Sequence, residues 1–304
     1  MKENILITGG SGLLALNWAT TMREKFNITL GLHDRKVNLK DTKNVLLGLD
    51  SKEVLTKAFE DLQPQLVIHA AGLTSIEQCE ANPTLAKYIN VDLTKNLATV
   101  CAYLNIPMVY ISTDHLFSGN ESLVHEDYPV SPVNVYAKTK AEAETCILDA
   151  DTKALIIRTN FYGWGTSYRQ SFSDIVINHL RAGKKISLFK DIYYTPMLIE
   201  PLVYAVHELV NKKVKGVFNV VGDDRISKYD FGVKLAREFN LDNDLIDEGK
   251  IIDKPSLAAR PHDMSLSNQK VTNFLGVKMG GLDEHILKLK AQEVNGFAKE
   301  LQAL

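Results

Sequence analysis

The segment Thr8-Gly9-Gly10-Ser11-Gly12-Leu13-Leu14-Ala15 decides the fold of this chain. It follows an apolar run over residues 5–8 that predicts a short strand, and a helical pattern comes after it. Gly9 permits a tight turn after the strand, Gly12 lets backbone N–H groups approach a phosphate, and the small Ala15 lets the helix pack closely on the strand. Because a helix N-terminus offers free N–H groups and a positive dipole, the segment predicts a binding site for the pyrophosphate of a dinucleotide.

Strands and helices alternate over the first half of the chain. Strands are predicted at residues 5–8, 27–32, 44–47, 66–69, 107–112 and 154–158. Helices are predicted at residues 14–26, 50–62 and 84–104, and from residue 136 onward. Asp50 and Glu53 have the spacing of a capping box, with Asp50 as the N-cap. Such repeated βα units imply right-handed crossovers and an α/β fold with a Rossmann-type, doubly wound parallel sheet.

The alternation loosens after Thr159. A loop rich in Gly and aromatic residues is predicted over 160–171, helices over 174–182, 200–210 and 229–239, a strand over 217–221 and a mostly irregular stretch over 249–261. We therefore expect a dinucleotide-binding Rossmann domain of residues 1–160, together with about 195–222. The rest, about 161–194 and 223–304, is expected to form a smaller interleaved lobe that binds the substrate.

Composition and charge exclude several classes of function. The chain has 304 residues and a formal net charge of −2, so neither a nucleic acid nor an anionic membrane is expected as a partner. No apolar run approaches the roughly 20 residues that span a bilayer. Cys79, Cys101 and Cys146 have no metal-ligand spacing, which predicts small apolar residues in a reducing compartment and no metal site. The N-terminus runs directly into the phosphate turn, so a cleaved signal would remove the turn and we expect a cytoplasmic protein.

The end of the predicted strand over 27–32 normally contacts the ribose of the adenosine. An acidic residue there favours a free 2′-hydroxyl, whereas a basic residue favours a 2′-phosphate. This chain has His33-Asp34-Arg35-Lys36, with His33 where the acid would be expected and Arg35 able to bind a phosphate. The pattern favours NADP(H); NAD(H) is the alternative, if Asp34 contacts the hydroxyl.

A hydroxyl and a Tyr-Lys pair predict proton-transfer chemistry. Thr113 lies at the carboxyl end of the predicted strand over 107–112, where its hydroxyl can bond a substrate carbonyl. Tyr136 and Lys140 are four residues apart and share one face of a helix. A free phenol has a pKa near 10, and a neighbouring ammonium favours the phenolate. We therefore expect Lys140 to lower the pKa of Tyr136 and to make it an effective proton donor at neutral pH.

Seven motifs in the same order resemble the extended short-chain dehydrogenase/reductase superfamily and, within it, the dTDP-4-dehydrorhamnose reductase group. They are TGGSGLLA at 8–15, HAAGLT at 69–74, STDHLF at 112–117, YAKTK at 136–140, RTNFYG at 158–163, TPMLIEPL at 195–202 and ARPHDMSL at 259–266. The resemblance covers nearly the whole chain.

The resemblance also implies which residues act. It implies a catalytic set of Thr113, Tyr136 and Lys140. The motifs and the interpretation of residues 33–36 together give the residues expected to bind the cofactor. They are Gly9, Ser11, Gly12, Leu13, Leu14, His33, Arg35, Leu49, Ala70, Ala71, Tyr136 and Lys140. The expected sugar contacts are Thr74, Asp114, His115, Phe117 and Phe161, with Arg260 facing the diphosphate, where a guanidinium fork suits phosphate oxygens.

The chain departs from the family pattern at three places. His115 stands where the reductases often carry Tyr, and the Glu that dehydratases carry there is absent, which argues against water elimination. Met264 replaces a small hydroxyl residue. Gly48 occupies the position where the family carries an acidic residue that contacts the adenine. The backbone of Gly48 and Leu49 is therefore left to face the adenine. These departures leave the natural sugar open.

The implied activity is NAD(P)H-dependent reduction of a 4-keto (6-deoxy) sugar carried on a nucleotide diphosphate, in a protein whose fold is compatible with a homodimer. One alternative is an NAD-dependent nucleotide-sugar epimerase, which uses the same catalytic residues. Another is a non-catalytic protein like the regulatory subunit of methionine adenosyltransferase, which resembles the same group. The sequence leaves open the base, the sugar, the product stereochemistry and the oligomeric state.

Overall fold

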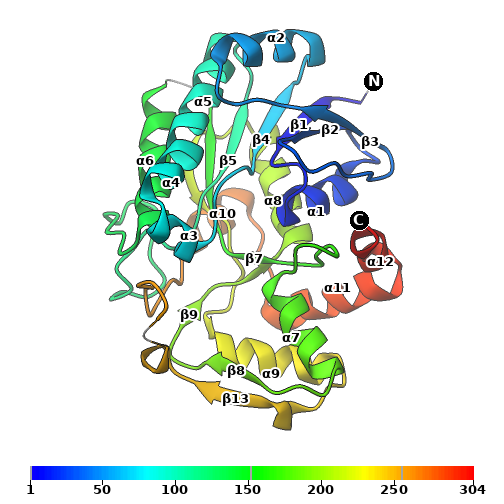
Figure 1. The fold of residues 1–304 in the computed structure, drawn as a ribbon, viewed down its shortest axis with the longest axis vertical. Helices are drawn as coiled ribbons and strands as arrows, with labels where there is room; N and C mark the ends of the chain where they lie inside the picture. Colours follow the sequence, from blue (N-terminus) through cyan, green and yellow to red (C-terminus); the bar gives the residue numbers. More distant parts are fainter. Residues whose placement is uncertain (1, 151–152, 255) are drawn as a thin grey trace.

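A seven-stranded parallel sheet forms the centre of the molecule in the computed structural model, which describes residues 2–150, 153–254 and 256–304 (Figure 1). The strand order is β11-β6-β5-β4-β1-β2-β3, and each neighbouring pair is parallel. The order runs outward from β1 in both directions, which is the doubly wound arrangement. The predicted fold class is confirmed.

The strands of this sheet match the predicted positions within two residues. They are β1 (Asn4–Thr8), β2 (Asn27–Leu32), β3 (Thr42–Leu46), β4 (Leu66–His69), β5 (Met108–Ile111), β6 (Leu155–Arg158) and β11 (Gly216–Asn219). β4, β5 and β6 are buried throughout, as expected of parallel strands that are covered on both faces.

Helices cover both faces of the sheet. On one face, Leu6 of β1 belongs to a core shared with α2 (Lys52–Leu62), α5 (Leu93–Tyr103) and α6 (Val135–Asp149). On the other face, Ile5 and Ile7 belong to a larger core with α1 (Leu13–Met22), α8 (Ile199–Asn211) and α10 (Gln269–Leu275). Alternate residues of one strand therefore face the two cores.

Two helix predictions were wrong in detail. The first helix ends at Met22 and not at residue 26. The predicted cap of the second helix is also wrong: Ser51, not Asp50, is the N-cap, and its hydroxyl accepts a hydrogen bond from the Val54 N–H at 3.2 Å. The Ser51 hydroxyl itself donates to Glu53, so the capping group lies one residue later than predicted.

The single helix predicted over 84–104 is divided. It follows α3 (Ile76–Ala81) and consists of α4 (Pro83–Lys87), a π-helical segment η1 (Tyr88–Asp92) and α5. π-helical turns are rare and occur often at functional sites. This one carries Asn90, which lines the cleft described below.

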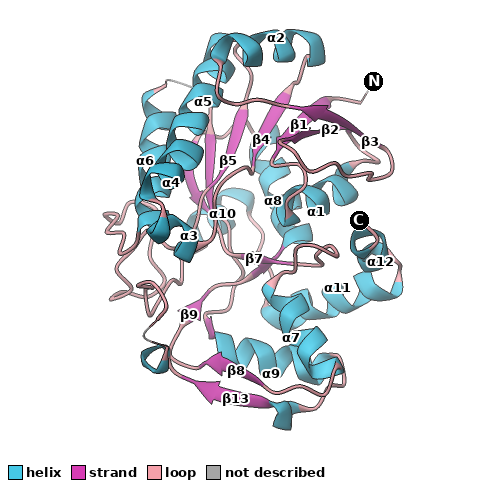
Figure 2. Cartoon of the chain, in the orientation of Figure 1, coloured by secondary structure: helices cyan, strands magenta, loops and turns pink. Residues whose placement is uncertain are grey.

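A second group of elements lies beyond the carboxyl end of the sheet, at the bottom of Figure 2. It comprises α7 (Phe172–Arg181), the parallel pair β8 (Ile186–Phe189) and β13 (Ile246–Gly249), and α9 (Lys228–Glu238). From this group, α11 (Leu282–Val294) and α12 (Phe297–Gln302) lead back toward α1, at mid-height in Figure 2. The short pairs β7 (Phe161–Tyr162) with β10 (Met197–Leu198), and β9 (Tyr193–Tyr194) with β12 (Ile226–Ser227), complete the strands. Two 3-10 turns, η2 (Asn243–Leu245) and η3 (Ile251–Asp253), complete the helices.

Most of the later predictions agree with these elements. The helices predicted over 174–182, 200–210 and 229–239 correspond to α7, α8 and α9, whereas the loop predicted over 160–171 contains β7. The irregular stretch predicted over 249–261 contains η3, and its residue 255 lies outside the described residues. The domain boundaries stay a prediction. Within the described ranges, no helix has the length and apolar character needed to span a bilayer.

Candidate active site

A cleft of about 500 Å³ opens at the carboxyl ends of β1, β4, β5 and β6. Parallel sheets of this kind bind ligands at this edge, and the volume is typical of a small-molecule site. The cleft brings together most of the predicted site residues: Gly9, Ser11, Gly12, Leu13, Leu14, Ala70, Ala71, Thr74, Thr113, Asp114, His115, Tyr136, Lys140 and Phe161.

The glycine turn after β1 forms one wall. Gly9 has φ +67, and a Cβ atom there would lie 2.8 Å from the Cα and N atoms of Ala71. Gly12 is the N-cap of α1, and no side chain caps this end of the helix. The first amides of α1 therefore face the cleft without a side-chain acceptor, so this turn fits the pyrophosphate of a dinucleotide.

The loop after β4 forms the adjoining wall, next to the glycine turn, and is held from two sides. The Asn90 carboxamide of η1 accepts from the Leu73 N–H at 2.8 Å and donates to the Leu73 carbonyl at 3.0 Å and to the Thr139 hydroxyl at 3.0 Å. Beneath the loop, Thr8 bonds the buried His69 ring at 2.7 Å, and burial lowers the pKa of His69 to about 3. The wall beside Ala70 and Ala71 is therefore fixed by neutral hydrogen bonds.

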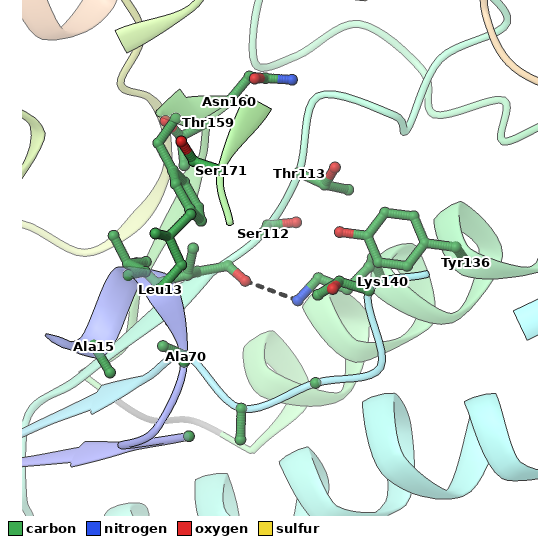
Figure 3. A pocket seen from close by; sticks show the side chains of 18 of the residues that line it. Leu13, Ala15, Ala70, Ser112, Thr113, Tyr136, Lys140, Thr159, Asn160 and Ser171 are labelled. Carbon is green, nitrogen blue, oxygen red and sulfur yellow. Dashed lines mark hydrogen bonds between the residues drawn. The ribbon is translucent and has the colours of Figure 1, made fainter. Parts of the chain in front are cut away.

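Tyr136 projects into the cleft from the first turn of α6. Its phenol oxygen points toward Ser112 and Thr113 at the end of β5 (Figure 3). Burial raises the pKa of Tyr136 to about 12, and a hydrogen bond with the Thr113 hydroxyl acts in the opposite direction. The expectation that Lys140 would lower this pKa was wrong for the protein as it stands, because desolvation of the 8% exposed phenol dominates.

Lys140 lies one turn further along α6 and is 6% exposed. Its ammonium donates to the Ile111 carbonyl at 2.7 Å (Figure 3) and lies 4.1 Å from the centroid of the Tyr110 ring. Burial lowers the pKa of Lys140 to about 7, and the carboxylate of Glu144 opposes this shift. A buried basic group is thus fixed beside Tyr136 at this side of the cleft.

A buried network supports this arrangement from below. Glu144 accepts a hydrogen bond from the Ser112 hydroxyl at 2.5 Å and forms an ion pair with Arg158, whose Nη2 lies 2.7 Å from Oε2. All three side chains are buried. The network joins the ends of β5 and β6 to α6, so Tyr136 and Lys140 are held relative to both strands.

The far end of the cleft carries a buried carboxylate. Asp114 accepts from the Asn160 carboxamide at 2.6 Å and from the Thr113 hydroxyl at 3.3 Å. His115 lies edge-on to the Tyr136 ring at a centroid distance of 5.8 Å, and its buried Nδ1 has no hydrogen-bond partner in the described structure. Burial lowers the pKa of His115, so a neutral imidazole faces this end.

Lys228, at the start of α9, adds a cation that the sequence analysis did not single out. Its ammonium lies 3.3 Å from the centroid of Tyr194 and 4.8 Å from that of Phe172, a ring that lines the cleft. This ammonium forms no ion pair and no hydrogen bond among the described residues. Burial lowers the pKa of Lys228 to about 8, and Asp114 is the charge that opposes the shift.

Five predicted residues do not line the cleft: His33, Arg35, Leu49, Phe117 and Arg260. The first two are exposed beyond β2, with the Arg35 guanidinium 4.1 Å from the Tyr168 ring centroid. The Leu49 carbonyl accepts from Asn96, Phe117 is buried in a small apolar cluster, and the Arg260 guanidinium pairs with Glu77. Their roles stay predictions.

Other cleft residues were missed. They include Asn90, Ser112, Thr159, Asn160, Arg169, Gln170, Ser171 and Phe172. Asn160 could have been found, because it lies within the quoted motif over 158–163. The residues over 169–172 carry no local signal, since they reach the cleft only through the path of the chain between β7 and α7.

Comparison with known proteins finds a matching family, similar sequences and similar solved structures. A family model described as RmlD substrate binding domain matches residues 1–292. The probable low-salt glycan biosynthesis reductase Agl14 of Haloferax volcanii is 29% identical over 290 residues, covering 94% of this chain and 96% of the relative. Methionine adenosyltransferase 2 subunit beta of Mus musculus is 27% identical over 280 residues, covering 89% and 82%. The fold is similar to that of dTDP-4-dehydrorhamnose reductase from Bacillus anthracis in complex with NADP, with TM-score 0.85, 23% identity and coverage of 96% and 100%.

Proposed function

Because this chain belongs to the family described as RmlD substrate binding domain, we propose that it is an NAD(P)H-dependent oxidoreductase that reduces a 4-keto sugar on a nucleotide diphosphate. The family match confirms the resemblance to the dTDP-4-dehydrorhamnose reductase group that the sequence motifs indicated. The observation that carries the proposal is one cleft that holds the glycine turn together with Thr113, Tyr136 and Lys140. NADP(H) is favoured as the cofactor, in agreement with the NADP bound to the Bacillus anthracis reductase, and NAD(H) is the alternative.

In this proposal Tyr136 is the proton donor. With a pKa of about 12 the phenol is fully protonated at neutral pH, so the proton is available when an alkoxide forms at the sugar carbonyl. Thr113 would turn its hydroxyl hydrogen from Asp114 to the same oxygen and donate a second hydrogen bond. A bound reduced nicotinamide would supply the hydride. Lys140 stabilises the negative charge that develops on the phenol as its proton leaves, and we assign to it the ribose contact as well.

The far end of the cleft would bind the sugar. Asp114 accepts hydrogen bonds from sugar hydroxyl groups, and Asn160 holds the carboxylate in place. His115 offers a neutral nitrogen without a protein partner, and Lys228 offers a free ammonium. Arg260, from the motif over 259–266, is assigned to the diphosphate. Residues 161–194 and 223–304, which include Lys228, are proposed as the substrate lobe.

Two alternatives make different predictions for purified protein. An epimerase would retain tightly bound NAD and interconvert two sugars without net consumption of cofactor. A regulatory subunit is suggested by the similarity to methionine adenosyltransferase 2 subunit beta, and it would copurify with a catalytic synthetase. Neither alternative requires an external reductant to be consumed, whereas the proposed reductase does. A cytoplasmic location and a homodimer stay predictions.

The decisive experiment measures NADPH and NADH consumption with a panel of nucleotide-linked 4-keto-6-deoxy sugars. The panel varies the base and the sugar, and Tyr136→Phe serves as the matched control. We expect consumption equal to the amount of 4-hydroxy sugar formed with at least one substrate. Conversion of a sugar with no loss of NADPH would support the epimerase, and no turnover across the panel would contradict the reductase.

A further inference from the structure

The segment between β7 and α7 lies across the cleft. Its base is fixed by Asp174, whose carboxylate accepts from the Gly165 N–H at 2.8 Å and from the Ser171 N–H at 2.8 Å. The middle of the segment contacts both the glycine turn and the loop after β4. The Tyr168 hydroxyl donates to the Ser11 carbonyl in the glycine turn at 2.9 Å, and the Arg169 guanidinium donates to the Thr74 hydroxyl, beyond β4, at 2.9 Å.

Tyr168 also contacts the residue predicted to read the cofactor's ribose. The Arg35 guanidinium lies 4.1 Å from the centroid of the Tyr168 ring, which is the geometry of a cation–π contact. Arg35 is exposed, and its guanidinium forms no hydrogen bond or ion pair within the described residues. A stacked guanidinium keeps its N–H edges free, so these donors are available for phosphate oxygens.

We infer that Tyr168 is a positioning residue that sets the preference for NADPH over NADH by holding Arg35 for the 2′-phosphate. The inference rests on the cofactor of the proposed function. Its ring restricts the Arg35 side chain before the cofactor binds, and its hydroxyl fixes the ring to the turn that receives the pyrophosphate. The part of the chain that selects the cofactor thus includes a residue more than a hundred positions away from β2.

The physical reason is preorganisation. An unrestrained arginine loses rotamer freedom when it binds a phosphate, at a cost that corresponds to about two- to tenfold in affinity. Stacking on Tyr168 removes part of this freedom in the free protein. NADH has no 2′-phosphate, so its affinity does not depend on where Arg35 lies. A role for Tyr168 in packing alone would affect both cofactors equally, and this difference separates the two explanations.

The test measures dissociation constants of NADPH and NADH by titration of the intact protein. Tyr168→Leu should weaken NADPH binding about two- to tenfold relative to NADH, because the ring that holds Arg35 is lost. Tyr168→Phe keeps the ring and loses the bond to Ser11, so it should preserve the ratio of the two constants within about twofold. Tyr204→Leu is the matched control. Tyr204 lies on α8, and its ring contacts the ammonium of Lys25 as the Tyr168 ring contacts Arg35.

The decisive comparison repeats Tyr168→Leu in an Arg35→Ala background. Arg35→Ala alone should shift the ratio by about tenfold or more, and Tyr168→Leu should then shift it by less than about twofold, because the two residues act together. An equal shift in both backgrounds would overturn the inference, as would an unchanged ratio in Tyr168→Leu. If Tyr168→Leu does not fold, Tyr168→Met fills the space without an aromatic face and gives the same comparison.

The outcomes separate the inference from the proposed function. A wild-type protein that binds neither cofactor would contradict the proposed function. A protein that binds both cofactors but prefers NADH would overturn the inference and leave a nicotinamide-dependent reductase intact. In that case Asp34, and not Arg35, contacts the ribose.

Discussion

Replacing Lys140 by Met should change how the stability of the protein depends on pH. Lys140 is buried, and its pKa falls from the ordinary 10.5 to about 7 in the folded protein. Between these two values the unfolded chain holds a proton that the folded chain has lost, so the free energy of unfolding rises with pH. The slope from one such group is about 1.4 kcal/mol per pH unit. From about pH 7.5 to about pH 9, the wild type should therefore gain up to about 2 kcal/mol relative to Lys140→Met.

The sign follows from the direction of the shift. Because the pKa is lower in the folded protein, the free energy of unfolding is highest above 10.5, the pKa in the unfolded chain. It then falls as the pH drops toward about 7, the pKa in the folded protein. Urea unfolding of wild type, Lys140→Met and Lys138→Met over this range measures the effect. Lys138 lies on the exposed side of the same helix and is the matched control. Lys228 titrates in the same direction but is present in all three proteins, so it cancels. Parallel curves for wild type and Lys140→Met would refute the argument from burial.

Three further predictions test the site and the corrected helix cap. Tyr136→Phe should bind cofactor nearly as well as wild type and lose turnover by about two orders of magnitude or more, as measured by NADPH consumption; near-normal turnover would remove it as the proton donor. Lys228→Met should raise the KM for the nucleotide sugar about tenfold without changing the affinity for NADPH, with Lys234→Met on the same helix as control; a weaker affinity for NADPH instead would contradict a sugar contact. Ser51→Ala should lower the free energy of unfolding by about 1 kcal/mol and Asp50→Ala by less than about 0.5 kcal/mol in urea titrations, and equal losses would mean that Ser51 is not the cap.

The parts of the fold that the sequence predicted best are those set by local pattern. β2 and β4 have the predicted bounds, because each is an apolar run with a sharp end. The π-helical segment at Tyr88–Asp92 could not be predicted, since its extra residue per turn leaves no mark on composition. Its reason is tertiary: Asn90 bonds both the loop after β4 and α6.

Some residues of the candidate site were also predictable from local sequence, and others were not. Thr113, Tyr136 and the glycine turn were predictable because each follows a strand or opens a helix, and parallel strands end at one edge of the sheet. Arg169 lines the cleft from the segment before α7, and Lys228 lies beside Phe172, a ring that lines the cleft. No periodicity in the sequence specifies where such a loop or helix start lies relative to the sheet, so these two side chains could be located only from the structure.

The pKa values of the central pair show what spacing alone leaves out. Two groups four residues apart are close, which predicts that the ammonium lowers the pKa of the phenol. The same burial that brings Tyr136 and Lys140 into one cleft also removes water from both, and desolvation of the charged form is the largest cause of each pKa shift. The phenol therefore keeps its proton, and the ammonium is close to losing one. A protonated Tyr136 can give a proton to the alkoxide that forms when a sugar carbonyl is reduced, which is the role that the proposed reductase requires of this phenol.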